Sequence, residues 1–184
     1  ELVHPDILVS GVLPKRAALR RRNRGFEGLC ASDDGRHLYV GFQSALKGED
    51  EHSAPVWKLG ARKGEFEGES FYPFDKPSSF GRDAKRRKPD AGDLKICELA
   101  WAGKDRLIVL ERISHTAKIC LVSLKKPAQK RLLISSDDHP EIGPDIEGMA
   151  LLSPTEILIS SDNDFGVEGA ETAFWRITLD EAIA

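Results

Sequence analysis

Short apolar runs of four to seven residues recur along the chain, separated by turn residues. The pair Asp34-Gly35 stands between two of these runs, and this dipeptide is a strong hairpin signal. The i, i+3, i+4, i+7 spacing of an amphipathic helix is not sustained anywhere. The pattern therefore predicts an all-β protein. The predicted strands lie at residues 6–10, 25–31, 37–42, 55–59, 70–74, 94–101, 106–111, 117–124, 130–135, 145–150, 157–159 and 172–179.

Most of these strands fall into three similar units. Each unit opens on a glutamate, Glu27, Glu98 or Glu147, and its second strand starts 9 to 11 residues later. Repeats of about 40–50 residues with four short strands are typical of β-propeller blades. We therefore predict one partial β-propeller domain over residues 1–184, with about three four-stranded blades; the fourth strand of the last blade is either missing or lies elsewhere. The units span about 24–75, 94–136 and 144–179, and a basic loop covers about 75–93.

The bulk composition changes this picture little. A chain of 184 residues can bury a real core, and 40% hydrophobic with 31% charged residues indicates a folded domain. The net charge of −3 argues against a nucleic-acid binder. No window reaches the ~20 apolar residues of a membrane span, and the first five residues do not form a signal peptide. The cysteines Cys30, Cys97 and Cys120 lack zinc-site spacing, so we predict buried thiols.

The repeated glutamates suggest a site. In a propeller, the innermost strands of successive blades converge around one axis, which would bring Glu27, Glu98 and Glu147 to one level. Such an all-oxygen set suits a hard cation, and Ca²⁺ fits best. Two structural alternatives remain. Each Glu would instead cap a turn, and residues 162–164 would instead form an Asx-type turn. The polar residues expected to join the ring from neighbouring strand ends are Gln43, Glu111, Asp162 and Asn163.

Several carboxylates in a narrow channel raise one another's pKa, so a cation or an Arg partner is expected. Arg24 and Arg112 are the nearest arginines in sequence, and Arg112 would either hold a substrate anion or pair with a channel carboxylate. A bound cation would polarise an ester or phosphoryl oxygen and activate a water. The candidate catalytic residues are Glu27, Glu98, Glu147 and Arg112. The candidate metal ligands are Glu27, Glu98, Glu147, Asp162 and Asn163.

Five segments together resemble the esterase-like phytase family, or phytase-like domain. The resemblance covers about Leu13 to Leu179 and matches the later part of a longer, propeller-like family domain. It implies a six-bladed propeller, hydrolysis of a phosphoester or carboxylic ester, and a periplasmic or secreted location. The pair Asp162-Asn163 is also similar to the calcium-binding pair of six-bladed calcium-dependent lactonases and esterases. The segments that carry the family resemblance are Asn23–Leu29, Cys97–Trp101, Leu110–Arg112, Asp145–Ala150 and Ser161–Phe165.

Three blades cannot close a ring, and open edge strands tend to pair. We therefore predict that the missing N-terminal part of the same domain, or a second chain, completes the propeller. The predicted function is divalent-cation-dependent hydrolysis of a small-molecule ester or phosphoester by metal-activated water. The alternative is a non-catalytic propeller that serves as a binding or scaffold module. The basic runs 15–24 and 82–88 either attract substrate phosphates or form a solvated surface.

Overall fold

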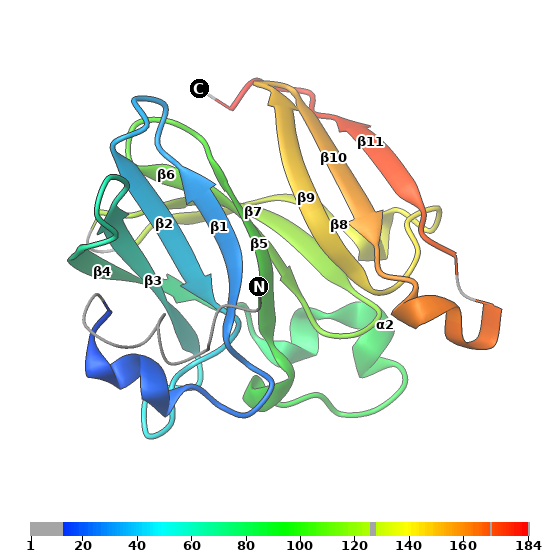
Figure 1. Ribbon diagram of the computed structural model, residues 1–184. Helices are drawn as coiled ribbons and strands as arrows, with labels where there is room; N and C mark the ends of the chain where they lie inside the picture. The colour runs from blue at the N-terminus through cyan, green and yellow to red at the C-terminus, as the bar shows by residue number, and fades with distance from the viewer. Residues whose placement is uncertain (1–12, 126–127, 170, 184) are drawn as a thin grey trace.

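The computed structural model describes residues 13–125, 128–169 and 171–183, and the regular secondary structure of this part is mostly β-strand with a few short helical turns. Its strands form three antiparallel sheets, which we call blades 1, 2 and 3 (Figure 1). Blade 1 contains β1 (Phe26–Ala31), β2 (His37–Phe42), β3 (Ser53–Gly60) and β4 (Phe66–Pro73). Blade 2 contains β5 (Lys95–Trp101), β6 (Arg106–Arg112), β7 (Ala117–Ser123) and β8 (Lys130–Ser135). Blade 3 contains β9 (Ile146–Ser153), β10 (Glu156–Ser161) and β11 (Phe174–Thr178).

The blades fan out from their first strands. The inner strand β5 contacts β1 on one side and β9 on the other, whereas successive strands of each blade lie progressively farther outward (Figure 1). The all-β prediction is therefore confirmed, and the arrangement is propeller-like. The three described blades do not close into a ring. The strand predicted at residues 6–10 lies outside the described residues.

Two apolar layers hold the fan together. Between blades 1 and 2, Tyr39 and Val56 meet Leu99 and Val109, all of them buried. Gly28 permits this close approach, because a Cβ atom there would lie 2.6 Å from the Leu99 side chain. The layer between blades 2 and 3 is aliphatic. Its buried members include Ile108, Leu110, Ile119, Ile146, Met149, Ile157, Ile159 and Ile177.

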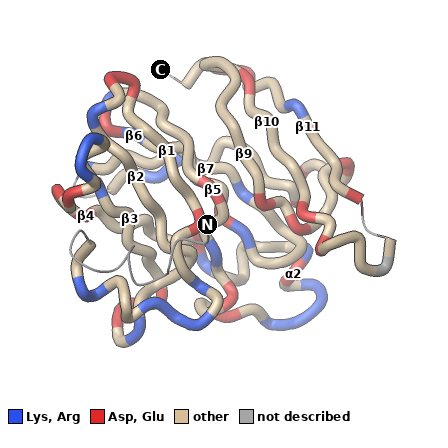
Figure 2. Tube along the Cα trace, in the orientation of Figure 1, with Lys and Arg blue, Asp and Glu red and all other residues tan. Residues whose placement is uncertain are grey.

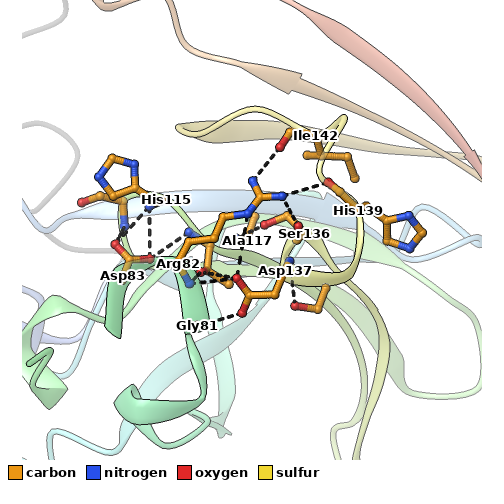
Figure 3. A network of polar contacts seen from close by, with 12 residues as sticks. Gly81, Arg82, Asp83, His115, Ala117, Ser136, Asp137, His139 and Ile142 are labelled. Atoms are coloured by element: carbon orange, nitrogen blue, oxygen red, sulfur yellow. Dashed lines mark hydrogen bonds and ion pairs between the residues drawn. The ribbon is translucent and has the colours of Figure 1, made fainter. Parts of the chain in front are cut away.

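The segment 75–93, predicted as a basic loop, is ordered by short helical turns, among them α2 (Gly81–Ala84). Asp83 is buried and accepts hydrogen bonds from the backbone N–H groups of Ser114, His115 and Thr116. Arg82 lies beside it and donates to backbone carbonyls around β8 and the loop that follows, including that of Ile142 at 2.7 Å (Figure 3). The segment is thus fastened to blade 2 and to the connection between blades 2 and 3.

The other short helical turns lie before β1 or between strands. They are η1 (Lys15–Leu19), η2 (Pro77–Ser79), η3 (Ala91–Asp93), η4 (Ser136–Asp138) and η5 (Asp164–Gly169).

Candidate functional site

Each inner strand has one extra residue near its start. The strand registers skip one position in β1, β5 and β9, which is the signature of a β-bulge. The residues that lack a cross-strand backbone partner at these bulges are Glu27, Cys97 and Glu147. Glu98 follows its bulge and is equivalent to Gly28 and Gly148. The paired residues that fix this equivalence are Phe26 with Phe42, Ile96 with Glu111, and Ile146 with Ser161.

The structural repeat therefore carries Glu, Cys and Glu, so the alignment of Glu98 with Glu27 and Glu147 is wrong by one residue. The carboxylate of Glu98 instead accepts hydrogen bonds from the backbone N–H groups of Leu99, at 2.9 Å, and Leu29, at 3.3 Å. Burial raises the pKa of Glu98, and these two bonds oppose that rise. For Glu98 the structure thus shows the capping alternative, and the cap ties β5 to β1.

Arg112, the last residue of β6, joins the bulges of β5 and β9. Its guanidinium is buried and forms ion pairs with Asp145, at 2.8 Å, and with Glu147. Its Nε donates to the Cys97 sulfur at 3.2 Å. Burial alone would lower the pKa of Arg112, but the Cys97 sulfur and the carboxylates of Glu147 and Asp145 raise it above the ordinary value. Arg112 is therefore a permanent cation, and of its two predicted roles the structure shows the pairing with carboxylates.

Glu27 lies beside this group in an unfavourable place for a negative charge. Burial raises the pKa of its carboxyl group, and the charge of Glu147 raises it further. The cations Lys95, Arg112 and Arg24 act in the opposite direction without cancelling the effect. Glu27 consequently retains its proton to a higher pH than an ordinary glutamate does.

Two more cations complete the group. Arg24 donates to the carbonyls of Leu94 and Gly92, both at 2.9 Å. The Lys95 ammonium group forms no hydrogen bond or ion pair with the described residues. Burial together with the charges of Arg112 and Arg24 lowers its pKa, and the attraction of Cys97 and Glu147 does not cancel this effect. Charged segments of both signs lie where the inner strands begin (Figure 2). We call this set the inner-strand cluster; it comprises Arg24, Glu27, Lys95, Cys97, Arg112, Asp145 and Glu147.

The acidic segment after β10 forms a turn. Asp162 donates its backbone N–H to the Asp145 carbonyl at 2.9 Å, and its side chain accepts from the Asp164 N–H at 3.2 Å. The Asn163 carbonyl accepts from the Gly166 N–H at 2.8 Å. This is the Asx-type turn that the sequence left as an alternative. The predicted role of Asp162 and Asn163 as metal ligands stays a prediction.

Glu111 does not join the cluster. Its side chain has no solvent exposure and faces blade 1. It accepts from the Tyr72 hydroxyl of blade 1 at 2.6 Å and from Lys130 of blade 2 at 2.5 Å. Lys130 also pairs with Asp75 at 2.7 Å, and Lys118 pairs with the same carboxylate at 2.7 Å. The expectation that Glu111 would lie at one level with the repeated glutamates is wrong, because its side chain belongs to this internal network between blades 1 and 2.

The described carboxylates do not form a ready cation site. No group of three or more His, Cys, Asp or Glu side chains in the described ranges is arranged to hold a metal ion. Arg112 already neutralises Asp145 and Glu147. The donor set as arranged therefore fits an internal ion pair better than a calcium ion, and calcium binding stays a prediction.

Sequence reasoning missed Lys95, Cys97 and Asp145 as members of the cluster. Asp145 could have been predicted from the sequence, since it stands two residues before Glu147 in a segment that carries the family resemblance. Cys97 was hidden by the bulge, which shifts the structural repeat by one residue and leaves no trace in composition.

A fan of antiparallel sheets with charged groups at the starts of its inner strands defines a propeller-like protein with a candidate polar site. The model of the Phytase-like family, described as esterase-like activity of phytase, matches residues 5–165. The chain belongs to this family. No match was found among curated proteins or among solved structures. In the part of the chain that the structure describes, no helix is long and apolar enough to cross a membrane.

Proposed function

We propose that the chain is a phytase-like hydrolase that cleaves a small anionic ester, with phosphoesters as the first candidates, at the inner-strand cluster. Membership of the family supports hydrolysis of an ester. The observation that carries the choice of an anionic substrate is the Lys95 ammonium group. It forms no hydrogen bond or ion pair with the described residues, and Arg24 and Arg112 lie within its electrostatic reach together with Glu147. Such a group gains most from a phosphate, whose oxygens accept charge-assisted hydrogen bonds.

Five residues of the cluster have a role in this proposal. Lys95 binds the phosphoryl oxygens, and Arg24 adds positive potential while its own N–H groups hold the backbone. Arg112 fixes Glu147 and keeps it from repelling the substrate. Glu27, whose pKa is raised, acts as the general acid. Water attacks phosphorus, the ester P–O bond breaks, and the proton of Glu27 passes to the leaving oxygen; Glu27 then recovers a proton from the water.

The calcium dependence predicted from the sequence is a separate part of the proposal. A cation at Glu147 would have to replace Arg112, which holds that carboxylate and Asp145. For this reason no step of the reaction above runs through a metal. Comparison of turnover with and without a chelator tests calcium dependence independently.

The test measures turnover of phytate, p-nitrophenyl phosphate and p-nitrophenyl acetate by the wild-type chain and by variants. Glu27→Gln should lower kcat on phosphoesters by about 100-fold or more, the usual contribution of a general acid. Lys95→Ala should mainly raise KM. The matched controls are Glu65→Gln and Lys47→Ala, at exposed positions of blade 1 and its loops. Unchanged phosphoester kinetics in both cluster variants would exclude this mechanism.

One observation favours the alternative, a non-catalytic binding or scaffold module. Arg112, Asp145, Glu147 and Cys97 satisfy one another, as a purely structural network would. The alternative expects no turnover of any substrate in the panel, with or without chelator. Under it, calorimetry could still show binding of inorganic phosphate that Lys95→Ala weakens.

A further inference from the structure

A polar hollow lies between blades 1 and 2, away from the inner-strand cluster. The strands β1 and β5 run side by side (Figure 1), and the cluster residues Glu27 and Lys95 stand at their starts. The hollow lies at the other ends of these strands, and none of its described lining residues belongs to the cluster. Its volume is about 320 Å³, at the lower end of the range of small-ligand sites. The lining includes Asp33, Asp34, Tyr39, Lys58, Trp101 and Asp105.

Two aromatic residues from different blades line the hollow and carry polar groups that lack partners. The rings of Tyr39 and Trp101 stack, with their centroids 5.0 Å apart and their planes 18° from parallel. Tyr39 is 4% exposed, yet its hydroxyl forms no hydrogen bond with any described residue. The Trp101 Nε1–H group is buried and also lacks a partner in the described ranges. Because buried polar groups in native proteins nearly always have a hydrogen-bond partner, these two donors indicate a ligand that carries oxygen atoms.

Tyr39 and Lys58 supply hydrogen-bond donors to the hollow. Burial and the charge of Asp105 raise the pKa of Tyr39 to about 12, so the hydroxyl keeps its proton at neutral pH. Lys58 lies on β3, and its ammonium nitrogen is 3.5 Å from the Glu67 carboxylate, which is longer than a charge-assisted hydrogen bond. The Lys58 ammonium group therefore keeps donors for a ligand.

Two loop carboxylates supply acceptors. Asp105 lies in the tight turn between β5 and β6, where Lys104 and Asp105 have φ values of 53° and 57°, both positive as in a type I′ hairpin turn. Asp33 lies in the loop after β1. Neither carboxylate forms a hydrogen bond or ion pair within the part of the chain that the structure describes. Both are therefore available to accept hydrogen bonds from a ligand.

This mixture of groups decides the class of ligand. An anion would meet the carboxylates of Asp33 and Asp105. A cation would meet Lys58 and would leave the Trp101 N–H without an acceptor. A sugar hydroxyl both donates and accepts, so a ring that carries several hydroxyls suits the donors and the acceptors alike. Its C–H groups can pack against the aromatic side chains, since small-molecule sites combine apolar walls with a few placed polar groups.

We propose that this hollow binds a neutral hexose, either free or as one unit of a polysaccharide. The ring hydroxyls donate to the two carboxylates and accept from the Tyr39 hydroxyl and the Lys58 ammonium group. A second hollow of about 260 Å³ adjoins the first, shares Tyr39, Lys58 and Asp105 with it, and gives room for the next unit of a polysaccharide. The proposal does not rest on the proposed hydrolase activity, because the hollow and the inner-strand cluster share no described residue.

Nuclear magnetic resonance tests the proposal through the indole N–H signal of Trp101, which is identified as the one lost in Trp101→Phe. Titration of the wild-type chain with glucose, galactose and mannose should shift this signal in a saturable way for at least one sugar. Choline chloride and sodium phosphate are the cationic and anionic comparisons, and neither should shift it. Tighter binding of the matching disaccharide, cellobiose, lactose or mannobiose, indicates a unit of polysaccharide as the ligand, and equal binding indicates the free sugar.

Two variants and a matched control locate the binding. Tyr39→Phe keeps the stacking on Trp101 and removes a hydroxyl without a described partner, so stability should hold while sugar affinity falls about 2- to 10-fold. Asp105→Gly removes one carboxylate at a positive φ that glycine adopts freely, and should weaken binding about 10-fold or more. Lys104→Gly is the control, because it makes the same backbone change one residue earlier, outside the lining of the hollow.

The Lys104→Gly control should bind the sugar as the wild type does. A Trp101 signal that responds to none of the sugars would overturn the proposal, as would a response to choline or phosphate alone. Equal losses of affinity in Asp105→Gly and Lys104→Gly would also contradict it, because flexibility of the turn would then account for the loss. Unchanged affinity in Tyr39→Phe together with Asp105→Gly would show that the sugar binds elsewhere on the chain.

Discussion

At the scale of single residues, Arg112 holds the cluster together. Its side chain is 5% exposed, whereas its partners Asp145 and Glu147 are 52% and 42% exposed. Arg112→Met should lower the free energy of unfolding by about 2–3 kcal/mol. This is below the roughly 3–5 kcal/mol for breaking a fully buried pair, because water can solvate the two carboxylates left behind. Urea denaturation measures the change.

The control for this prediction is Arg176→Met, which breaks the ion pair of Arg176 with Glu156 on blade 3. The Arg176 side chain is 65% exposed, so its loss should cost less than about 1 kcal/mol. Equal losses in the two variants would show that burial of Arg112 adds nothing to stability.

The raised pKa values of the three thiols predict a loss of stability at alkaline pH. Burial raises the pKa of Cys97 to about 11 and the pKa values of Cys30 and Cys120 to about 12, from an ordinary value of 9.0. Above pH 9 the unfolded chain releases these protons while the folded chain keeps them. Stability should therefore fall as the pH rises above 9, by up to about 1.4 kcal/mol per pH unit for each thiol.

Urea midpoints measured from pH 8 to pH 11 check this slope. The variant Cys30→Ala removes one of the three thiols at a position that is only partly buried, and its curve should be flatter than that of the wild type. If the two curves run parallel above pH 9, the Cys30 thiol does not contribute as stated.

The residues of the cluster were only partly predictable from the sequence. The sequence predicts Glu27, Glu147 and Arg112 as site residues, because their charge pattern can be recognised without knowledge of the strand register. The sequence does not predict that Cys97, instead of Glu98, occupies the position equivalent to Glu27 and Glu147. A bulge depends on how the strand pairs with its neighbour, which the sequence of β5 alone does not determine.

At the scale of elements, strands were easier to predict than the segment 75–93. Strand formation follows from local runs of apolar residues, and the runs that fall within the described ranges correspond to β1 through β11. The order of residues 75–93 depends instead on distant partners. Asp83 binds the amide of Thr116, and Arg82 binds the carbonyl of Ile142. Composition contains no information on either contact, so the polar, basic sequence of this segment indicates only a loop.

Asp83→Ala tests what holds this segment. The Asp83 side chain accepts from three consecutive backbone amides, and its loss would leave them without partners in a buried place (Figure 3). We expect a loss of about 2–3 kcal/mol, the value of a hydrogen bond to a charged group. Hydrogen exchange should rise across residues 81–93, and trypsin should cleave faster at the basic residues 85–87.

Asp138→Ala is the matched control, because Asp138 is exposed and lies next to Asp137, which binds the same segment. It should change neither exchange nor cleavage. If Asp83→Ala left exchange in residues 81–93 at the wild-type rate, the hydrogen bonds of Arg82 and Asp137 would be sufficient to hold the segment.

At the scale of the whole molecule, the sequence predicted the all-β class and a propeller-like arrangement, because a repeated strand pattern leaves few alternatives. It did not predict how the blades interlock. That depends on small residues such as Gly28 and Gly41, which receive Leu99 from the next blade. A glycine in a strand pattern suggests a close approach of backbones, but only the structure shows what approaches.

Gly28→Val tests this interlocking of blades. A Cβ at Gly28 would lie 2.6 Å from Leu99 Cγ and 2.8 Å from the Leu99 backbone nitrogen. The side-chain contact can yield by rotation, but the backbone contact cannot yield unless β5 moves away from β1. Overpacking of a formed core typically costs about 1–3 kcal/mol, so the unfolding free energy should fall by at least that amount.

Two further variants separate interlocking from strand propensity. Gly68→Val introduces the same side chain on β4, where nothing lies within 4 Å of the new Cβ, and it should leave stability unchanged or slightly higher because valine favours strands. Combining Gly28→Val with Leu99→Ala relieves the side-chain clash and leaves the backbone clash, so stability should not return to the level of Leu99→Ala alone. A full return of stability would mean that β1 and β5 can accommodate the new Cβ without moving apart. The packing of the blades would then depend on side-chain fit rather than on the distance between β1 and β5.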